Sequence, residues 1–165
     1  MTHKELVDIG AKWLKNHRNN INLRCNYVVT EFMTTAPERP DIFGLAGSSS
    51  TVCIEVKVSR SDFLRDAKKR HRKYTKGIGS RRFYLCPESM IKEHEVPPRV
   101  GLLYYNNNTQ KITGIKNSSY FHLEEREIIS EMTIMYSIIR RLAGNPKVFD
   151  FSQATTLLKK NTTSA

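Results

Sequence analysis

The chain has 165 residues, 39% hydrophobic and 26% charged, which predicts one soluble domain with a single core. No apolar run approaches the ~20 residues that span a bilayer, and no secretory leader opens the chain, so we expect a cytoplasmic protein and no membrane partner. The net charge of +11 favours a polyanionic partner, nucleic acid before an anionic membrane surface.

The first predicted element is an amphipathic helix. Thr2 and Glu5 have the spacing of a capping box, and apolar residues then recur at helical intervals until about Asn16. Residues 26–32 are rich in β-branched and aromatic side chains and predict a strand.

A predicted hairpin follows two prolines. Residues 41–45 form a short apolar strand, a Gly/Ser turn covers 47–50, and residues 51–58 are the strongest strand pattern in the chain. Side chains alternate along a strand, so Glu55 and Lys57 point to one face and are about 6.7 Å apart along it. The opposite face is apolar and carries Val52, Ile54, Val56 and Val58.

Residues 61–74 predict a helix whose beginning is capped by Ser59, with Asp62 three residues later. Its core face would be Phe63, Leu64, Ala67, His71 and Tyr74. From Lys57 to Arg82 there are eleven basic and two acidic residues, a local charge of +9. A solvated surface would explain such a run, but like charges repel along a helix, which favours an external phosphate backbone. The predicted DNA-binding residues are Arg60, Arg65, Lys68, Lys69, Arg72, Lys73 and Lys76.

The second half predicts a strand at 82–86, a hairpin formed by 100–105 and 111–115, and a helix over 124–142. The apolar face of that helix would be Ile128, Ile129, Met132, Met135, Ile139 and Leu142. The order α-β-β-β-α-β, then a hairpin and a helix, predicts an α/β domain with a mixed central sheet flanked by helices. We expect this domain to cover 1–150, with a frayed tail over 151–165.

Asp41, Glu55 and Lys57 are the candidate catalytic set. If the strands on either side of the Gly/Ser turn pair, Asp41 approaches the face that carries Glu55. Two carboxylates can hold Mg²⁺, or Mn²⁺ in its place, which activates water and stabilises charge on a phosphoryl oxygen. Lys57 would then orient the nucleophile and offset negative charge. The competing interpretation is a surface Glu–Lys pair and an ordinary turn residue at Asp41.

Longer motifs carry a family resemblance. Arg-Pro-Asp-Ile at 39–42, a hairpin, and Ile-Glu-Val-Lys-Val at 54–58 resemble the motif of the PD-(D/E)XK nuclease superfamily. The MmcB-like DNA-repair branch of that superfamily is similar in three longer runs, at 55–66, 82–87 and 96–103. The similarity covers roughly residues 26–105.

The resemblance implies a restriction-endonuclease-like core, Asp41 and Glu55 as metal ligands, and Lys57 as the catalytic lysine. It also implies one further upstream acidic residue. Glu31, within the predicted strand 26–32, fits that place best, and Glu5 is the alternative although a helix cap already explains it. Ser59 and Tyr74 match family-like positions, but a cap and a core aromatic explain them equally well.

The leading hypothesis is therefore a Mg²⁺-dependent nuclease that hydrolyses DNA, in repair, restriction or mobile-element processing. A non-catalytic DNA-binding module on the same fold is the second hypothesis, and a basic module for RNA, a partner protein or acidic lipid is the third. The sequence leaves a homodimer open and identifies no interface. Cys25, Cys53 and Cys86 are odd in number and widely spaced, which predicts buried reduced thiols.

Overall fold

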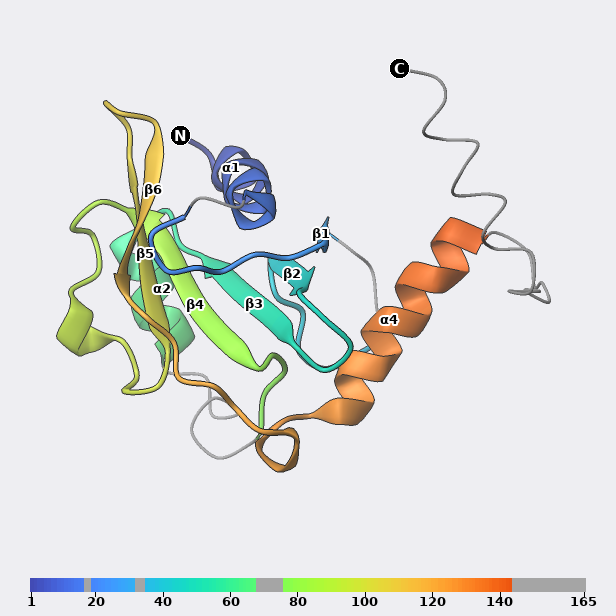
Figure 1. Ribbon diagram of the computed structural model, residues 1–165. Coiled ribbons are helices and arrows are strands. Elements are labelled where there is room, and N and C mark those ends of the chain that lie inside the picture. Colours follow the sequence, from blue (N-terminus) through green and yellow to red (C-terminus); the bar gives the residue numbers. More distant parts are fainter. Residues whose placement is uncertain (17–18, 32–34, 68–75, 144–165) are drawn as a thin grey trace, which may run out of the picture.

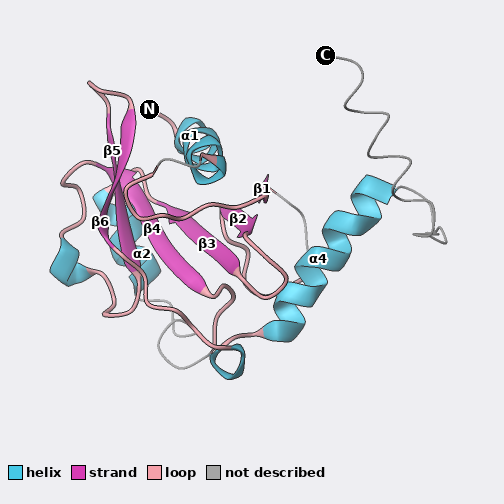
Figure 2. Ribbon diagram, viewed as in Figure 1, coloured by secondary structure: helices cyan, strands magenta, loops and turns pink. Residues whose placement is uncertain are grey.

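The computed structural model describes residues 1–16, 19–31, 35–67 and 76–143. Figure 1 shows a twisted sheet with helices on both of its faces, and Figure 2 shows the same view by type of element. The elements are α1 (His3–Lys15), β1 (Tyr27–Thr30), β2 (Ile42–Leu45), β3 (Thr51–Val56), α2 (Arg60–Ala67), β4 (Arg81–Pro87), η1 (Glu93–Glu95), β5 (Gly101–Asn106), β6 (Lys111–Lys116), η2 (Leu123–Glu125) and α4 (Ile128–Ala143).

The six strands lie in the sheet in chain order, from β1 to β6. β1, β2 and β3 are antiparallel neighbours, β3, β4 and β5 are parallel, and β6 returns antiparallel to β5. The predicted mixed sheet is confirmed, and so are its parts: the β2–β3 hairpin, the β3–α2–β4 crossover and the β5–β6 hairpin.

Alternation along the strands divides the core into two layers. On one face α1 packs against a layer that includes Ile42, Ile54 and Leu85. On the other face α2 places Phe63 against Tyr84, and α4 packs against the sheet near β2 and β3. The predicted apolar face of β3 is confirmed, because Val52, Ile54 and Val56 are fully buried.

The sequence explains where α1 begins and how closely it packs against the sheet. Glu5 N donates to Thr2 Oγ1 at 3.2 Å, and Thr2 N donates to Glu5 Oε2 at 2.6 Å, which is the predicted capping box. Gly10 lets the helix approach the sheet, because a Cβ there would lie 2.7 Å from Ile42 and Leu85. α1 is therefore fixed with its first turn near the beginning of β2.

The prediction for α4 was wrong about the buried face. The helix begins at Ile128, after the turn of η2, rather than at 124. Ile129, Met132, Ile139 and Leu142 of the predicted core face are exposed. The side that meets the sheet instead carries Ser130, Glu131, Ile134 and Ser137.

A buried polar cluster explains this orientation. Arg126 and Glu131 pair with 2% and 3% of their side chains exposed, and Arg126 Nε donates to Glu131 Oε1 at 2.9 Å. Glu131 also accepts from Thr51 Oγ1 at 3.0 Å and from Gly79 N at 2.8 Å. Ser80 Oγ donates to Thr51 O at 2.7 Å. We call Thr51, Ser80, Arg126 and Glu131 the closed cluster. Its hydrogen bonds favour the orientation in which the polar side of α4 faces the sheet.

Two further predictions were wrong in detail. Residues 26–32 do not form one strand: β1 ends at Thr30, and Glu31 has a left-handed backbone with φ 49°. Leu64 does not face the core but is 46% exposed. Much of the predicted helix over 61–74, including His71 and Tyr74, lies outside the described residues, as does the predicted tail over 151–165.

Two further features concern the cysteines and the lengths of the helices. Cys25, Cys53 and Cys86 are buried and free, as predicted. Burial raises the pKa of the Cys25 thiol to about 12 and that of Cys86 to about 11, so both are protonated at neutral pH. In the part of the chain that the structure describes, no helix has the length and apolar character needed to cross a bilayer.

Candidate active site

The carboxylate of Asp41 lies at the carboxyl end of β3. Asp41 directly precedes β2, whose first residue, Ile42, pairs with Ile54 of β3. Asp41 Oδ2 accepts a hydrogen bond of 2.7 Å from Val56 N, the backbone group between Glu55 and Lys57. The hairpin therefore brings the Asp41 carboxylate to the backbone that lies between the other two residues of the motif.

Lys57 is the most buried member of the set. Only 7% of its side chain is exposed, and its Nζ lies 3.7 Å from Glu55 Oε2 and 3.7 Å from Asp62 Oδ2. Its backbone N donates to Leu85 O at 2.9 Å, which extends the parallel pairing of β3 with β4 by one residue. A buried ammonium is costly unless carboxylates face it, and here two do.

Asp62 joins the site from the first turn of α2. Its backbone N donates to Ser59 Oγ at 3.3 Å, so Ser59 caps the helix as predicted, and the cap turns the Asp62 carboxylate toward Lys57. Arg65 Nη2 donates to the other Asp62 oxygen at 2.9 Å. We call Asp41, Glu55, Lys57 and Asp62 the open cluster, because its three carboxylate side chains remain 15–29% exposed.

His3 is a neighbour that the sequence did not indicate. Its Nε2 lies 3.3 Å from Asp41 Oδ2, and it belongs to the first turn of α1, which reaches the start of β2. No spacing in the sequence marks it, because 38 residues separate it from Asp41. The sequence did single out Asp62, but its position three residues after Ser59 was explained completely by a helix cap.

The two upstream acidic candidates have other partners. Glu31 Oε2 is 3.1 Å from Lys4 Nζ on α1, and this carboxylate is more than half exposed. Glu5 is occupied by the capping box, and its hydrogen bond with the Thr2 backbone lowers the pKa of its carboxyl group. The preference for Glu31 as a catalytic residue depended on a place within a strand, and that place was wrong.

The donor set at the open cluster fits a hard divalent cation. Among the residues that the structure describes, no three His, Cys, Asp or Glu side chains form a ready metal-binding group. Mg²⁺, however, is usually held by one or two carboxylates and keeps several waters, so Asp41 and Glu55 suffice. The Lys57 ammonium beside Glu55 shows that this position accepts positive charge.

Comparison with known proteins identifies a shared fold. No family model and no curated protein matches this chain. Among solved structures it is similar to the SPO1766 protein of unknown function from Silicibacter pomeroyi, with a TM-score of 0.54 and 18% sequence identity. The match covers 91% of this chain and 99% of that one, so the α/β arrangement recurs there over nearly its whole length.

The predicted DNA-binding residues are only partly described. Arg60 is paired with Glu95, Arg65 is paired with Asp62, and Lys76 is exposed. Lys68, Lys69, Arg72 and Lys73 lie outside the described residues. Two of the residues counted in the basic run are occupied internally: Arg81 donates to Ser118 O, and Arg82 donates to Gly77 O.

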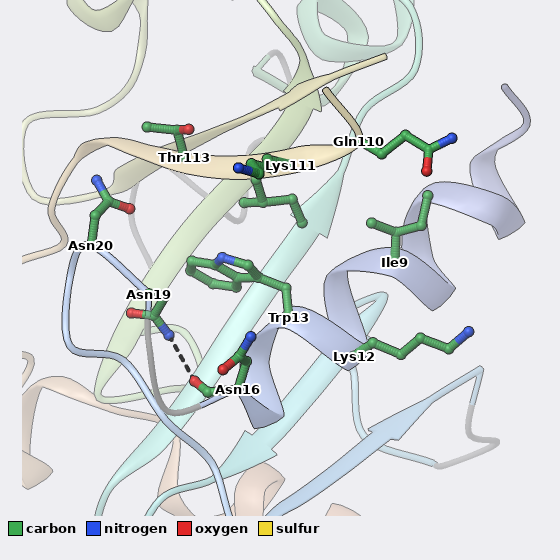
Figure 3. A pocket seen from close by; sticks show the side chains of 10 residues that line it. Ile9, Lys12, Trp13, Asn16, Asn19, Asn20, Gln110, Lys111 and Thr113 are labelled. Atoms are coloured by element: carbon green, nitrogen blue, oxygen red, sulfur yellow. Dashed lines mark hydrogen bonds between the residues drawn. The ribbon is translucent and has the colours of Figure 1, made fainter. Parts of the chain in front are cut away.

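A cleft of about 600 Å³ between α1 and β6 lies apart from these residues. Figure 3 shows the Trp13 ring of α1 facing Lys111 of β6 across it. The side-chain amide of Asn20 binds the backbone of Gly114. It donates one hydrogen bond to the carbonyl and accepts one from the N–H, each 2.9 Å long. None of the open-cluster residues lines this cleft, and we assign it no role in the site.

Proposed function

We propose that this protein is a divalent-metal-dependent nuclease of the PD-(D/E)XK type that hydrolyses DNA phosphodiester bonds. The observation that carries the proposal is the Asp41 carboxylate bonded to the backbone between Glu55 and Lys57, at the end of β3. A restriction-endonuclease-like core is supported by the order of the elements. The β2–β3 hairpin carries Glu55 near its end, and the crossover helix α2 and the parallel strand β4 follow it. The resemblance to the MmcB-like branch supports a role in DNA repair, with restriction and mobile-element processing as alternatives, and we propose a cytoplasmic location.

Asp41 and Glu55 would hold Mg²⁺ or Mn²⁺. When bound, the ion supplies an activated water and stabilises the charge that develops on the scissile phosphate. Glu55 lies in β3 and Asp41 directly precedes β2, and the hydrogen bond from Val56 N to Asp41 Oδ2 holds the Asp41 carboxylate at the end of β3.

Lys57 would act on the phosphate and on the attacking water. Its ammonium is held between Glu55 and Asp62 in a largely dry position, where a charge interaction is stronger than in water. If Glu55 held an ion, the Asp62 contact would keep Lys57 in place. Asp62 therefore positions Lys57 and need not touch the substrate.

Charge explains why DNA is the favoured substrate. The chain carries +11, and exposed Arg65 and Lys76 border the segment that holds the densest basic run. Such residues would hold phosphates by charge, which gives affinity without base recognition.

Cleavage of plasmid and single-stranded DNA in Mg²⁺ or Mn²⁺ tests the proposal. Asp41→Ala and Lys57→Ala should each lower the rate on the order of 100-fold or more. Glu124→Gln is a matched control, because this exposed carboxylate lies in η2, and it should cut like the parent. An Asp41→Ala protein that cuts as fast as the parent contradicts the proposal. Salt-sensitive binding without cleavage in either metal would leave a DNA-binding module.

A further inference from the structure

The outward face of α4 is an apolar stripe. Ile129, Met132, Tyr136 and Ile139 are 80%, 60%, 66% and 55% exposed. They lie on the side of the helix opposite Ile134, which is fully buried against the sheet. In Figure 1, α4 (orange) lies at the margin of the fold, and the stripe belongs to its outer side.

This stripe matches in size the largest apolar patch of a typical monomeric protein. Four such side chains leave on the order of 400–500 Å² of apolar area exposed, within the ~300–600 Å² of the largest patch on a typical monomer, which is often functional. Leu142, 84% exposed, and Met135 at its flank extend the patch toward the ~800 Å² per partner of a specific interface. The polar inner face already accounts for the packing of α4 against the described part of the sheet, and the stripe lies outside that contact.

The spacing of the stripe matches a second copy of itself. The intervals 129–132–136–139 are three, four and three residues, which is the a/d pattern of a coiled coil. The pattern is symmetric about residue 134. Two antiparallel copies of α4 related by a two-fold axis at that residue would place Ile129 against Ile139 of the other copy, and Met132 against Tyr136. A two-fold interface requires this self-complementarity.

Charge selects the antiparallel direction. The approach to α4 is acidic, with Glu124 and Glu127, and its last turn is basic, with Arg140 and Arg141. Antiparallel pairing sets the acidic end of one helix beside the basic end of the other and opposes the helix dipoles. Parallel pairing would bring like charges together at both ends.

We propose that this protein is a symmetric dimer in which α4 pairs antiparallel with α4 of a second copy through Ile129, Met132, Tyr136 and Ile139. The proposal is independent of the nuclease assignment, because the stripe shares no residue with the open cluster. Each copy would then present its own open cluster, away from the seam.

Molar mass in solution tests the dimer. Light scattering on the eluting full chain should give twice the 19.1 kDa of one copy. Met132→Glu and Ile139→Glu should each weaken association at least ~100-fold, because a charge would be buried at the seam without a partner. Ile115→Glu, at an exposed isoleucine of β6, is the matched control and should remain dimeric. Thermal midpoints near that of the parent would show that the variants are folded.

Cysteine cross-linking tests the direction, and the three native thiols are buried and do not compete. A mixture of Ile129→Cys and Ile139→Cys proteins should form a disulfide-linked dimer under mild oxidation, and neither protein alone should do so efficiently. A parent chain that is monomeric at all concentrations overturns the proposal, and so does a dimer that survives both glutamate variants. Efficient self-linking of Ile129→Cys would show a parallel pair and overturn the antiparallel assignment.

Discussion

The two ends of β3 each carry a charged cluster, and the two clusters are built differently. At the start of the strand, the closed cluster buries Arg126 and Glu131 almost completely and joins them by direct hydrogen bonds. At the other end, the open cluster keeps Lys57 at 3.7 Å from each of two carboxylates that remain in part exposed. The first geometry satisfies its charges internally, whereas the second leaves carboxylate surface that water or an ion can reach.

The difference separates a structural role from the chemical role that we propose for the open cluster. A buried ion pair contributes to a fold only when its geometry is excellent and the remaining polar atoms are bonded. The closed cluster meets that condition through Thr51, Ser80 and the backbone of Gly79. The open cluster sets three carboxylates against the single ammonium of Lys57, and under the proposed function a divalent ion would balance the two negative charges that remain.

The largest effect is expected at the closed cluster. Glu131→Gln should lower the free energy of unfolding by about 3–5 kcal/mol, because it leaves Arg126 buried without its counter-charge. Both oxygens of Glu131 accept hydrogen bonds, so the new amide must turn its NH₂ group toward donors. Urea denaturation measures the change, and Glu127→Gln is the neighbouring control. A loss below about 1 kcal/mol would contradict the structural role.

The same kind of change, a carboxylate replaced by its amide, should have the opposite effects at the open cluster: little on stability and much on cleavage. Asp41→Asn keeps an oxygen for the hydrogen bond from Val56 N and removes only a partly exposed charge. We expect the free energy of unfolding to change by less than about 1 kcal/mol, while DNA cleavage falls on the order of 100-fold. Urea denaturation and a cleavage assay on one preparation measure both. A large destabilisation with retained cleavage would reverse the assignment of the two clusters.

A small effect is expected at an exposed arginine–glutamate pair, which provides a third case for the comparison. Hydrogen bonds from Arg60 lower the pKa of Glu95 to about 2. Because the folded pKa is depressed, the contribution of this pair to stability is complete above the ordinary carboxyl pKa and is lost as pH falls toward 2. In Arg60→Gln the midpoint of Glu95, followed by carboxyl ¹³C NMR, should rise toward about 4.3. An unchanged midpoint would show that Arg60 does not hold Glu95.

Much of the fold is predictable from the sequence because it depends on local signals. The Thr2–Glu5 box, the Gly/Ser turn before β3 and the alternation of β3 each act within a few residues. The orientation of α4 is different. Periodicity shows that the helix has an apolar face but does not show which face meets the sheet, and that choice depends on Thr51, whose partner Glu131 is 80 residues away.

The candidate site divides in the same way. That Asp41 lies beside the strand carrying Glu55 and Lys57 could be predicted, because it depends on strand alternation and one hairpin. The place of Glu31 within a strand was wrong, since its turn conformation and its Lys4 partner are not visible in the local pattern. His3 reaches Asp41 only because α1 docks with its first turn at the start of β2, and no short-range rule predicts such docking.

The most direct test of the proposed site is Mn²⁺ binding to the apoprotein, measured by titration calorimetry without DNA. We expect the parent to bind the ion, Asp41→Asn and Glu55→Gln to bind it at least ~10–100-fold more weakly, and Glu124→Gln to match the parent. A parent chain that binds no ion, or an Asp41→Asn protein with the parent's affinity, would contradict a metal site at the end of β3.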